Sequence, residues 1–72
     1  MKIKDVDDFG KKIKERRRKL GYTQKYISDF IGFSVSFISD LENGKKTIEL
    51  GKALQLANIL GMDMILQERG NE

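Results

Sequence analysis

Basic side chains gather in one part of this 72-residue chain, and they favour binding to an anion over catalysis. Residues 11–25 contain eight lysines and arginines and a single acid, Glu15, for a net charge of +7, whereas the whole chain carries +3. The remainder is therefore neutral to acidic. Such a patch is typical of proteins that bind an anionic polymer, although a run of basic residues can also be only a solvated helix face.

The residue types behind most enzymatic and metal chemistry are missing. The chain has no cysteine and no histidine, which excludes disulfides, thiolate metal sites and the commonest general base. We therefore expect a protein that is not an enzyme and that uses no cofactor or metal. No apolar run suits a signal peptide or a membrane span, so we expect a cytoplasmic location.

Four helices must position this charge, and capping and glycine signals predict where they begin and end. The first has Asp7 or Asp8 as its N-cap, a stripe formed by Phe9, Ile13 and Leu20, and its end at Gly21. The second follows Thr23, spans residues 24–31, and presents an apolar face of Ile27, Phe30 and Ile31.

The third and fourth helices are read in the same way. The third follows Ser34, runs to about Asn43, and turns Phe37, Ile38 and Leu41 inward. The fourth begins near residues 47–49 and ends at Gly61. Its apolar stripe consists of Leu50, Ala53, Leu54, Ala57 and Leu60.

The last segment has a different pattern, with Met64, Ile65 and Leu66 in succession, which predicts a short strand within residues 62–67. One strand in a helical chain has no partner, so we expect it to pair with its twin in a homodimer. The dimerisation residues are then Met62, Met64, Ile65 and Leu66. The predicted organisation is an N-terminal extension (1–8), a helical domain (9–61), and a C-terminal strand and tail (62–72).

Only Gly32, Phe33 and Ser34 separate the second helix from the third. The glycine permits a sharp turn and Ser34 caps the next helix at once, so the two helices should cross steeply, as in a helix-turn-helix. In that motif the second helix lies in the major groove of DNA and the first crosses the phosphates.

The chain resembles the Cro/C1-type (XRE) helix-turn-helix family over about residues 9–61. The matching residues are Leu-Gly-Tyr-Thr-Gln at 20–24, Ile-Ser at 27–28, Ile-Gly-Phe-Ser at 31–34, and Phe-Ile-Ser-Asp-Leu-Glu-Asn-Gly-Lys at 37–45. Ser28 departs from the alanine that is usual in the family. The resemblance implies an all-α, lambda-repressor-like domain of four helices that binds a double-stranded DNA operator.

The resemblance also implies roles for single residues. It places the base-contacting residues on the exposed face of the third helix, where serines can donate or accept, valine can touch a thymine methyl and aspartate can accept from cytosine. They are Ser34, Val35, Ser36, Ser39 and Asp40. None is an arginine or asparagine, so indirect readout of DNA shape gains importance. The expected phosphate contacts are Thr23, Gln24, Asn43, Lys45 and Lys46.

Arg17 has a different expected role. The family often pairs an arginine here with the acid that corresponds to Glu42, and Arg17 lies on the apolar stripe of its helix. We therefore predict a structural ion pair between Arg17 and Glu42, with Arg16, Arg18 and Lys19 free for solvent or phosphate.

The tail narrows the resemblance to HipB-like antitoxins, including the Y4mF group, which also share the Phe9-Gly10 start and the sequence of residues 49–52. Their C-terminal strands pair across a two-fold axis, and their usual partner is a HipA-like kinase toxin. This implies a repressor that is also the antitoxin of a toxin–antitoxin system. Two alternatives stay open: a phage-type or metabolic repressor without a toxin, and a protein-interaction module that has lost DNA binding.

Overall fold

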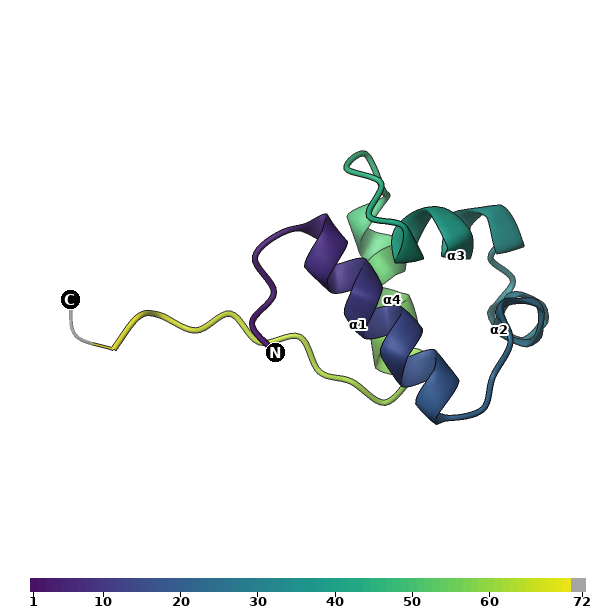
Figure 1. The fold of residues 1–72 in the computed structure, drawn as a ribbon, viewed down its shortest axis with the longest axis horizontal. Coiled ribbons are helices and arrows are strands. Elements are labelled where there is room, and N and C mark those ends of the chain that lie inside the picture. The colour runs from purple at the N-terminus through teal and green to yellow at the C-terminus, as the bar shows by residue number, and fades with distance from the viewer. Residues whose placement is uncertain (71–72) are drawn as a thin grey trace.

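A computed structural model describes residues 1–70 of the chain and shows an all-α domain. Its four helices are α1 (Val6–Lys19), α2 (Gln24–Ile31), α3 (Val35–Glu42) and α4 (Leu50–Ile59). In Figure 1, α1 and α4 cross the centre of the molecule, α3 lies above them, and α2 lies at the end opposite to the two chain termini. Residues 71 and 72, the end of the predicted tail, lie outside the described residues.

Short polar side chains cap the helices and set where they begin. Thr23 accepts a hydrogen bond from the backbone N–H of Tyr26 at 3.0 Å, as the predicted cap of α2. The predicted cap of α1 at Asp7 or Asp8 is wrong, because Asp5 has the extended backbone and its carboxylate accepts from the Asp8 N–H at 2.8 Å. The helix therefore starts at Val6, and the other two acids lie in its positively polarised first turn.

The core lies where the four helices meet, and it differs in part from the predicted stripes. Leu20 and Leu50 are exposed because one follows the last turn of α1 and the other begins α4, beyond the packed part of each stripe. Phe30 is 69% exposed, since α2 packs through Ile27 and Ile31. The buried apolar residues are Phe9, Ile13, Ile27, Ile38, Leu41, Ala53, Leu56, Ala57 and Leu60, of which Leu56 was not predicted.

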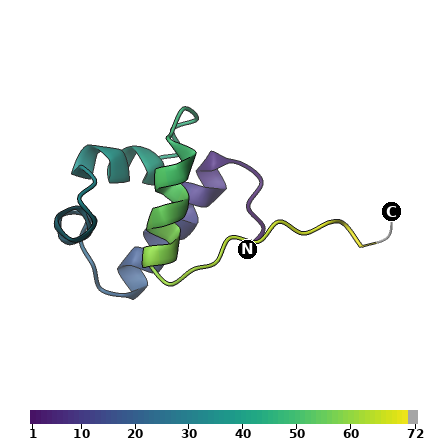
Figure 2. The same ribbon diagram turned by 180° about the vertical axis from the view of Figure 1, so that it is seen from behind.

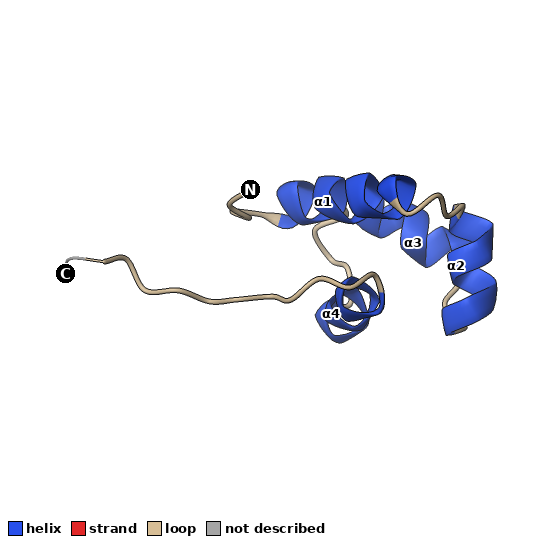
Figure 3. Ribbon diagram, turned by 90° about the horizontal axis from the view of Figure 1, so that it is seen from below, coloured by secondary structure: helices blue, strands red, loops and turns tan. Residues whose placement is uncertain are grey.

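The C-terminal tail leaves the end of α4 and projects away from the helices (Figures 2 and 3). Residues 62–69 have no regular secondary structure, so the strand predicted within 62–67 is not formed in the single chain. The physical reason is that an extended segment needs a neighbouring strand to complete its hydrogen bonds. Pairing with a second copy stays a prediction.

Gly10 marks a close approach between α1 and the end of α3. A Cβ at this position would overlap the carbonyl oxygen of Leu41 and press on the backbone of Glu42. The two helices can therefore pack at this distance only because residue 10 has no side chain.

Gly10→Ala should destabilise the domain by about 1–3 kcal/mol, because the methyl group pushes the two helices apart. The loss should appear even though alanine favours a helix by up to about 1 kcal/mol over glycine. The midpoint of urea unfolding at unchanged m-value measures it. The control is Gly51→Ala in α4, where the atoms nearest to the added group belong to the Glu49 side chain, so stability should stay unchanged or rise by up to about 1 kcal/mol. Equal stability of both variants would refute the close packing.

Candidate nucleic-acid interface

The turn between α2 and α3 is fixed by three local features. Gly32 ends α2 in the left-handed conformation, with φ of 86°. Ser34 begins α3 and accepts from the backbone N–H of Phe37 at 3.0 Å. Between them, the hydroxyl of Ser28 donates to the carbonyl oxygen of Phe33 at 2.6 Å. The residue that departs from the family pattern thus adds a bond across the turn.

The two helices cross steeply, since Figure 1 shows α2 end-on where α3 is seen from the side. The predicted base-contacting residues occupy α3 and its cap. Ser34, Val35 and Ser36 are exposed, whereas Ser39 and Asp40 are half-buried. Asp40 accepts from the Lys45 ammonium at 3.4 Å. Since this pair is largely exposed, it contributes little stability and can open when a ligand approaches.

The predicted phosphate contacts lie at the start of α2 and after α3. Asn43, Lys45 and Lys46 are exposed in the turn that follows α3. Thr23 is exposed and already caps α2. Gln24 is half-buried, and its amide donates to Glu42 at 3.1 Å, a contact that the sequence did not predict. The N-terminus of α2 still offers its backbone N–H groups to an anion.

Arg17 and Glu42 form a bidentate ion pair between α1 and the end of α3. Arg17 Nε donates to Glu42 Oε2 at 2.7 Å, and its Nη2 donates to Oε1 at 2.9 Å. The remaining guanidinium nitrogen, Nη1, donates to the carbonyl oxygen of Tyr22 at 2.8 Å. Both side chains are buried, at 8% and 6% residue exposure. The hydrogen bonds with Glu42 raise the pKa of Arg17 above its ordinary value, so the guanidinium stays charged.

Arg16 is bound to the protein, which corrects the expectation that it is free. Its Nε donates at 2.8 Å to the carbonyl oxygen of Leu60, the residue that caps the C-terminus of α4. A cation at a helix C-terminus satisfies a carbonyl and opposes the helix dipole. No local pattern could have found this contact, because it joins residues 44 positions apart.

Local acids neutralise much of the basic run. Lys11 pairs with Asp7 at 3.2 Å, Lys12 with Glu15, and Lys25 with Asp29. The contact with Asp7 raises the pKa of Lys11, which stays charged. Within residues 1–70, no acid pairs with the other four basic side chains of this run, which are Lys14, Arg16, Arg18 and Lys19. The cationic surface is thus smaller than the +7 of the sequence suggests.

Comparison with protein families matches residues 13–66 to the helix-turn-helix model. The chain belongs to the helix-turn-helix family. Members of the XRE type are DNA-binding transcriptional regulators, and the turn described above is the element that defines them.

Three relatives show how this helix-turn-helix protein compares in length. The HTH-type transcriptional regulator y4mF of Sinorhizobium fredii is 35% identical over 60 residues, which cover 83% of the chain and 79% of the relative. The prophage-derived regulator YonR of Bacillus subtilis is 35% identical over 54 residues, and the propionyl-CoA carboxylase regulator of Cereibacter sphaeroides is 34% identical over 55. The chain spans only 50% of YonR and 12% of the carboxylase regulator.

Solved structures with the same fold are a HipB–O4 20mer complex and a variant HipB–O2 20mer complex. Each superposes with a TM-score of 0.86 at 24% identity, over 97% of this chain. The helix-turn-helix protein therefore has the HipB fold along nearly its whole length.

Two further features concern the described residues. None of the four helices has the length and apolar character needed to cross a membrane. Within residues 1–70, acidic side chains do not gather in threes at any place where they could hold a metal ion.

Arg17→Met should cost about 3–5 kcal/mol, because it leaves the Glu42 carboxylate buried without its cation. The double change Arg17→Met with Glu42→Leu should recover much of that loss. Thermal melts of the wild type, both single variants and the double variant form a double-mutant cycle.

Arg18→Met is the matched control for this cycle, since Arg18 is exposed whereas Arg16 binds α4. It should change stability by less than about 0.5 kcal/mol. If the losses of the two single variants simply add, the ion pair does not couple α1 to α3.

Proposed function

We propose that this helix-turn-helix protein is a sequence-specific transcriptional repressor that binds a double-stranded DNA operator as a homodimer. One observation supports the DNA-binding role above all: the fixed turn sets α3 steeply across α2 and leaves the polar start of α3 exposed. This is the arrangement in which α3 enters the major groove and α2 meets the phosphates.

In this proposal Ser34, Val35 and Ser36 read base edges first, because they are the exposed members of the set. Ser39 and Asp40 join them once their contacts with Asn43 and Lys45 open. Thr23, Gln24, Asn43, Lys45 and Lys46 contact phosphates. When Lys45 leaves Asp40 for a phosphate, the aspartate becomes free to accept from a cytosine amino group.

We also propose that the protein is an antitoxin that represses its own operon and binds a HipA-like kinase toxin. The support is the fold shared with HipB, the match to most of the length of y4mF, and a tail with two highly exposed apolar residues. A repressor without a toxin is the second candidate, favoured by the prophage-derived and propionyl-CoA carboxylase relatives. Co-purification with the product of the adjacent gene, followed by a kinase assay of that product, separates the two.

Lys46→Ala and Ser36→Ala should weaken DNA binding in different ways. Loss of the lysine removes a phosphate contact, so affinity should fall alike for all sequences and the salt slope should drop by about one unit. Loss of the serine hydroxyl should change the preference at one or two base pairs by about 1–3 kcal/mol. Selection from random duplexes gives the operator, and salt-dependent titrations on operator and scrambled DNA measure both effects.

Arg18→Ala is the comparison variant, because Arg18 is an exposed cation of α1 that is expected to be free for solvent or phosphate. An unchanged affinity and salt slope would show that it contacts solvent only. If Lys46→Ala and Ser36→Ala changed the affinities for operator and scrambled DNA in the same way, the assignment of base contacts to the exposed face of α3 would be contradicted. If DNA binding depended on neither salt nor sequence, the result would favour the alternative that the chain is a protein-interaction module that has lost DNA binding.

Ile65→Glu should convert the homodimer to monomers and lower operator affinity much more than a single lost contact would. Two half-sites are bound jointly, so loss of the link removes the gain from effective concentration. Ile65 is 75% exposed in the single chain, so the change leaves the core intact. Sedimentation equilibrium and operator titration measure the two effects. An unchanged dimer would exclude the tail from the interface.

A further inference from the structure

Exposed aromatic side chains gather at the end of the molecule where α2 lies. The chain has two tyrosines, four phenylalanines and no tryptophan. Tyr22, Tyr26 and Phe30 are exposed, at 37%, 53% and 69%. The other three phenylalanines belong to the core or pack against it. All of the exposed aromatic side chains therefore lie on α2 or in the turn just before it.

These aromatic side chains border a hollow that reaches the end of α4. Its lining residues are Tyr22, Tyr26, Ile27, Phe30 and Ile59, and its volume is about 150 Å³. Ile59, the last residue of α4, is itself 40% exposed. The two tyrosine rings lie 4.9 Å apart between centroids and pack against each other. We call this site the aromatic hollow. Because its wall is already ordered, an apolar side chain can enter it at little cost in entropy.

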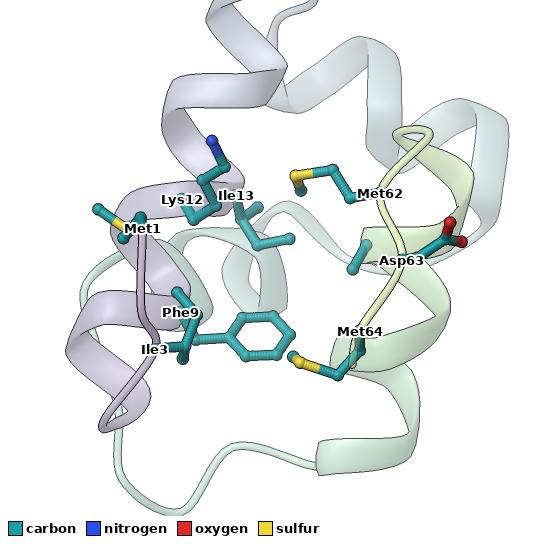
Figure 4. Close-up of a pocket in the computed structure, with 9 residues that line it drawn as sticks. Met1, Ile3, Phe9, Lys12, Ile13, Met62, Asp63 and Met64 are labelled. Carbon is teal, nitrogen blue, oxygen red and sulfur yellow. The ribbon is translucent and has the colours of Figure 1, made fainter. Parts of the chain in front are cut away.

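The aromatic hollow is separate from the surfaces proposed above. None of its five lining residues is among the expected DNA contacts. The larger cavity of the domain, of about 260 Å³, is lined by Met1, Phe9 and Met64 among others and borders the tail that the proposed dimer uses (Figure 4). Helix α2 lies at the opposite end of the molecule from that tail (Figure 1). Apolar surface that gathers in one exposed place marks an interaction site.

The charge beside the hollow is positive, and this selects the occupant. Arg18 and Lys19 end α1 directly before the turn that carries Tyr22, and within residues 1–70 no acid pairs with either cation. Asp29 of α2 is already paired with Lys25 at 2.7 Å. Two copies joined hollow to hollow would bring these cations against their own equivalents, which is unfavourable. An acidic partner gains from the same charges.

We propose that the aromatic hollow is a docking site for a segment of another protein that carries large apolar side chains among aspartates and glutamates. An apolar side chain of this segment enters the hollow between Tyr26 and Phe30, as interface anchors do. Its acids meet Arg18 and Lys19 at the rim. The inference goes beyond the proposed function and does not rest on it, because it needs neither DNA nor the dimer.

Peptide selection tests the docking site. A displayed library of random peptides is selected on the full-length wild-type chain and, in parallel, on the Phe30→Ala variant. Phe30 is mostly exposed and alanine favours a helix, so the melting temperature should not fall. The wild type should enrich peptides that carry a large apolar residue next to acids, and Phe30→Ala should not.

Titration of the most enriched peptide measures the two parts of the site. Phe30→Ala should raise the dissociation constant about tenfold, as loss of an aromatic hot spot does. Lys19→Ala should weaken binding as well and reduce its dependence on salt. The matched control is Ile65→Ala, which removes a side chain of the tail that is 75% exposed and should leave the peptide affinity unchanged.

The outcomes keep this proposal apart from the proposed function. The docking site is overturned if acidic peptides are not enriched, or if Phe30→Ala enriches them equally, since the attraction then comes from the basic run alone. The operator affinity of Phe30→Ala should equal that of the wild type, and a tenfold loss would assign the hollow to DNA instead. A chain that binds acidic peptides through Phe30 but binds no DNA would refute the repressor and keep the docking site.

Discussion

The buried ion pair between Arg17 and Glu42 is the constraint on which the arrangement of α3 depends. Two charges taken out of water are tolerated only when each remaining polar atom finds a partner. Here the carbonyl oxygen of Tyr22 accepts a hydrogen bond from the third guanidinium nitrogen, and the Gln24 amide donates to the carboxylate. The pair thus joins α1, the start of α2 and the end of α3. Its geometric demands fix the angle at which α3 is presented.

The close contact at Gly10 serves the same arrangement from the other end of α1. The helix lies against the backbone of Leu41 and Glu42, which brings the carboxylate within reach of Arg17. A side chain at position 10 would widen this gap, and the ion pair would then be exposed to water. The close packing at Gly10 therefore supports the charge pair, because it sets the distance that the pair spans.

Local patterns were sufficient to predict most of the fold. Thr23 and Ser34 cap helices because their hydroxyls accept orphan backbone N–H groups, and this preference is visible in sequence. The exposure of Leu20, Phe30 and Leu50 could not be predicted, because periodicity shows the face of a helix but not the length over which it is covered. The cap at Asp5 was missed because three acids within four residues are equally able to accept.

The features of the predicted interface also fall into two groups, those that follow from local sequence and those that join residues far apart in the chain. Exposure of Ser34, Val35 and Ser36 follows from their place at the start of a short helix. The contacts of Gln24 with Glu42 and of Arg16 with Leu60 join residues far apart in sequence. A single sequence contains no signal for such pairs. The charge of the basic run was overestimated as a surface for DNA, because its pairs with Asp7, Asp29 and Glu42, which lie outside the run, form only in the folded chain.

The adjacent arginines of α1 have a mechanical consequence. Successive residues on a helix point about 100° apart. Arg16 therefore binds the end of α4, while Arg17 binds the end of α3. The C-terminal tail begins at the end of α4, and Glu42 is the last residue of α3. Helix α1 therefore holds the end of α4 and the end of α3 through two neighbouring side chains, so the positions of these two ends depend on the same helix.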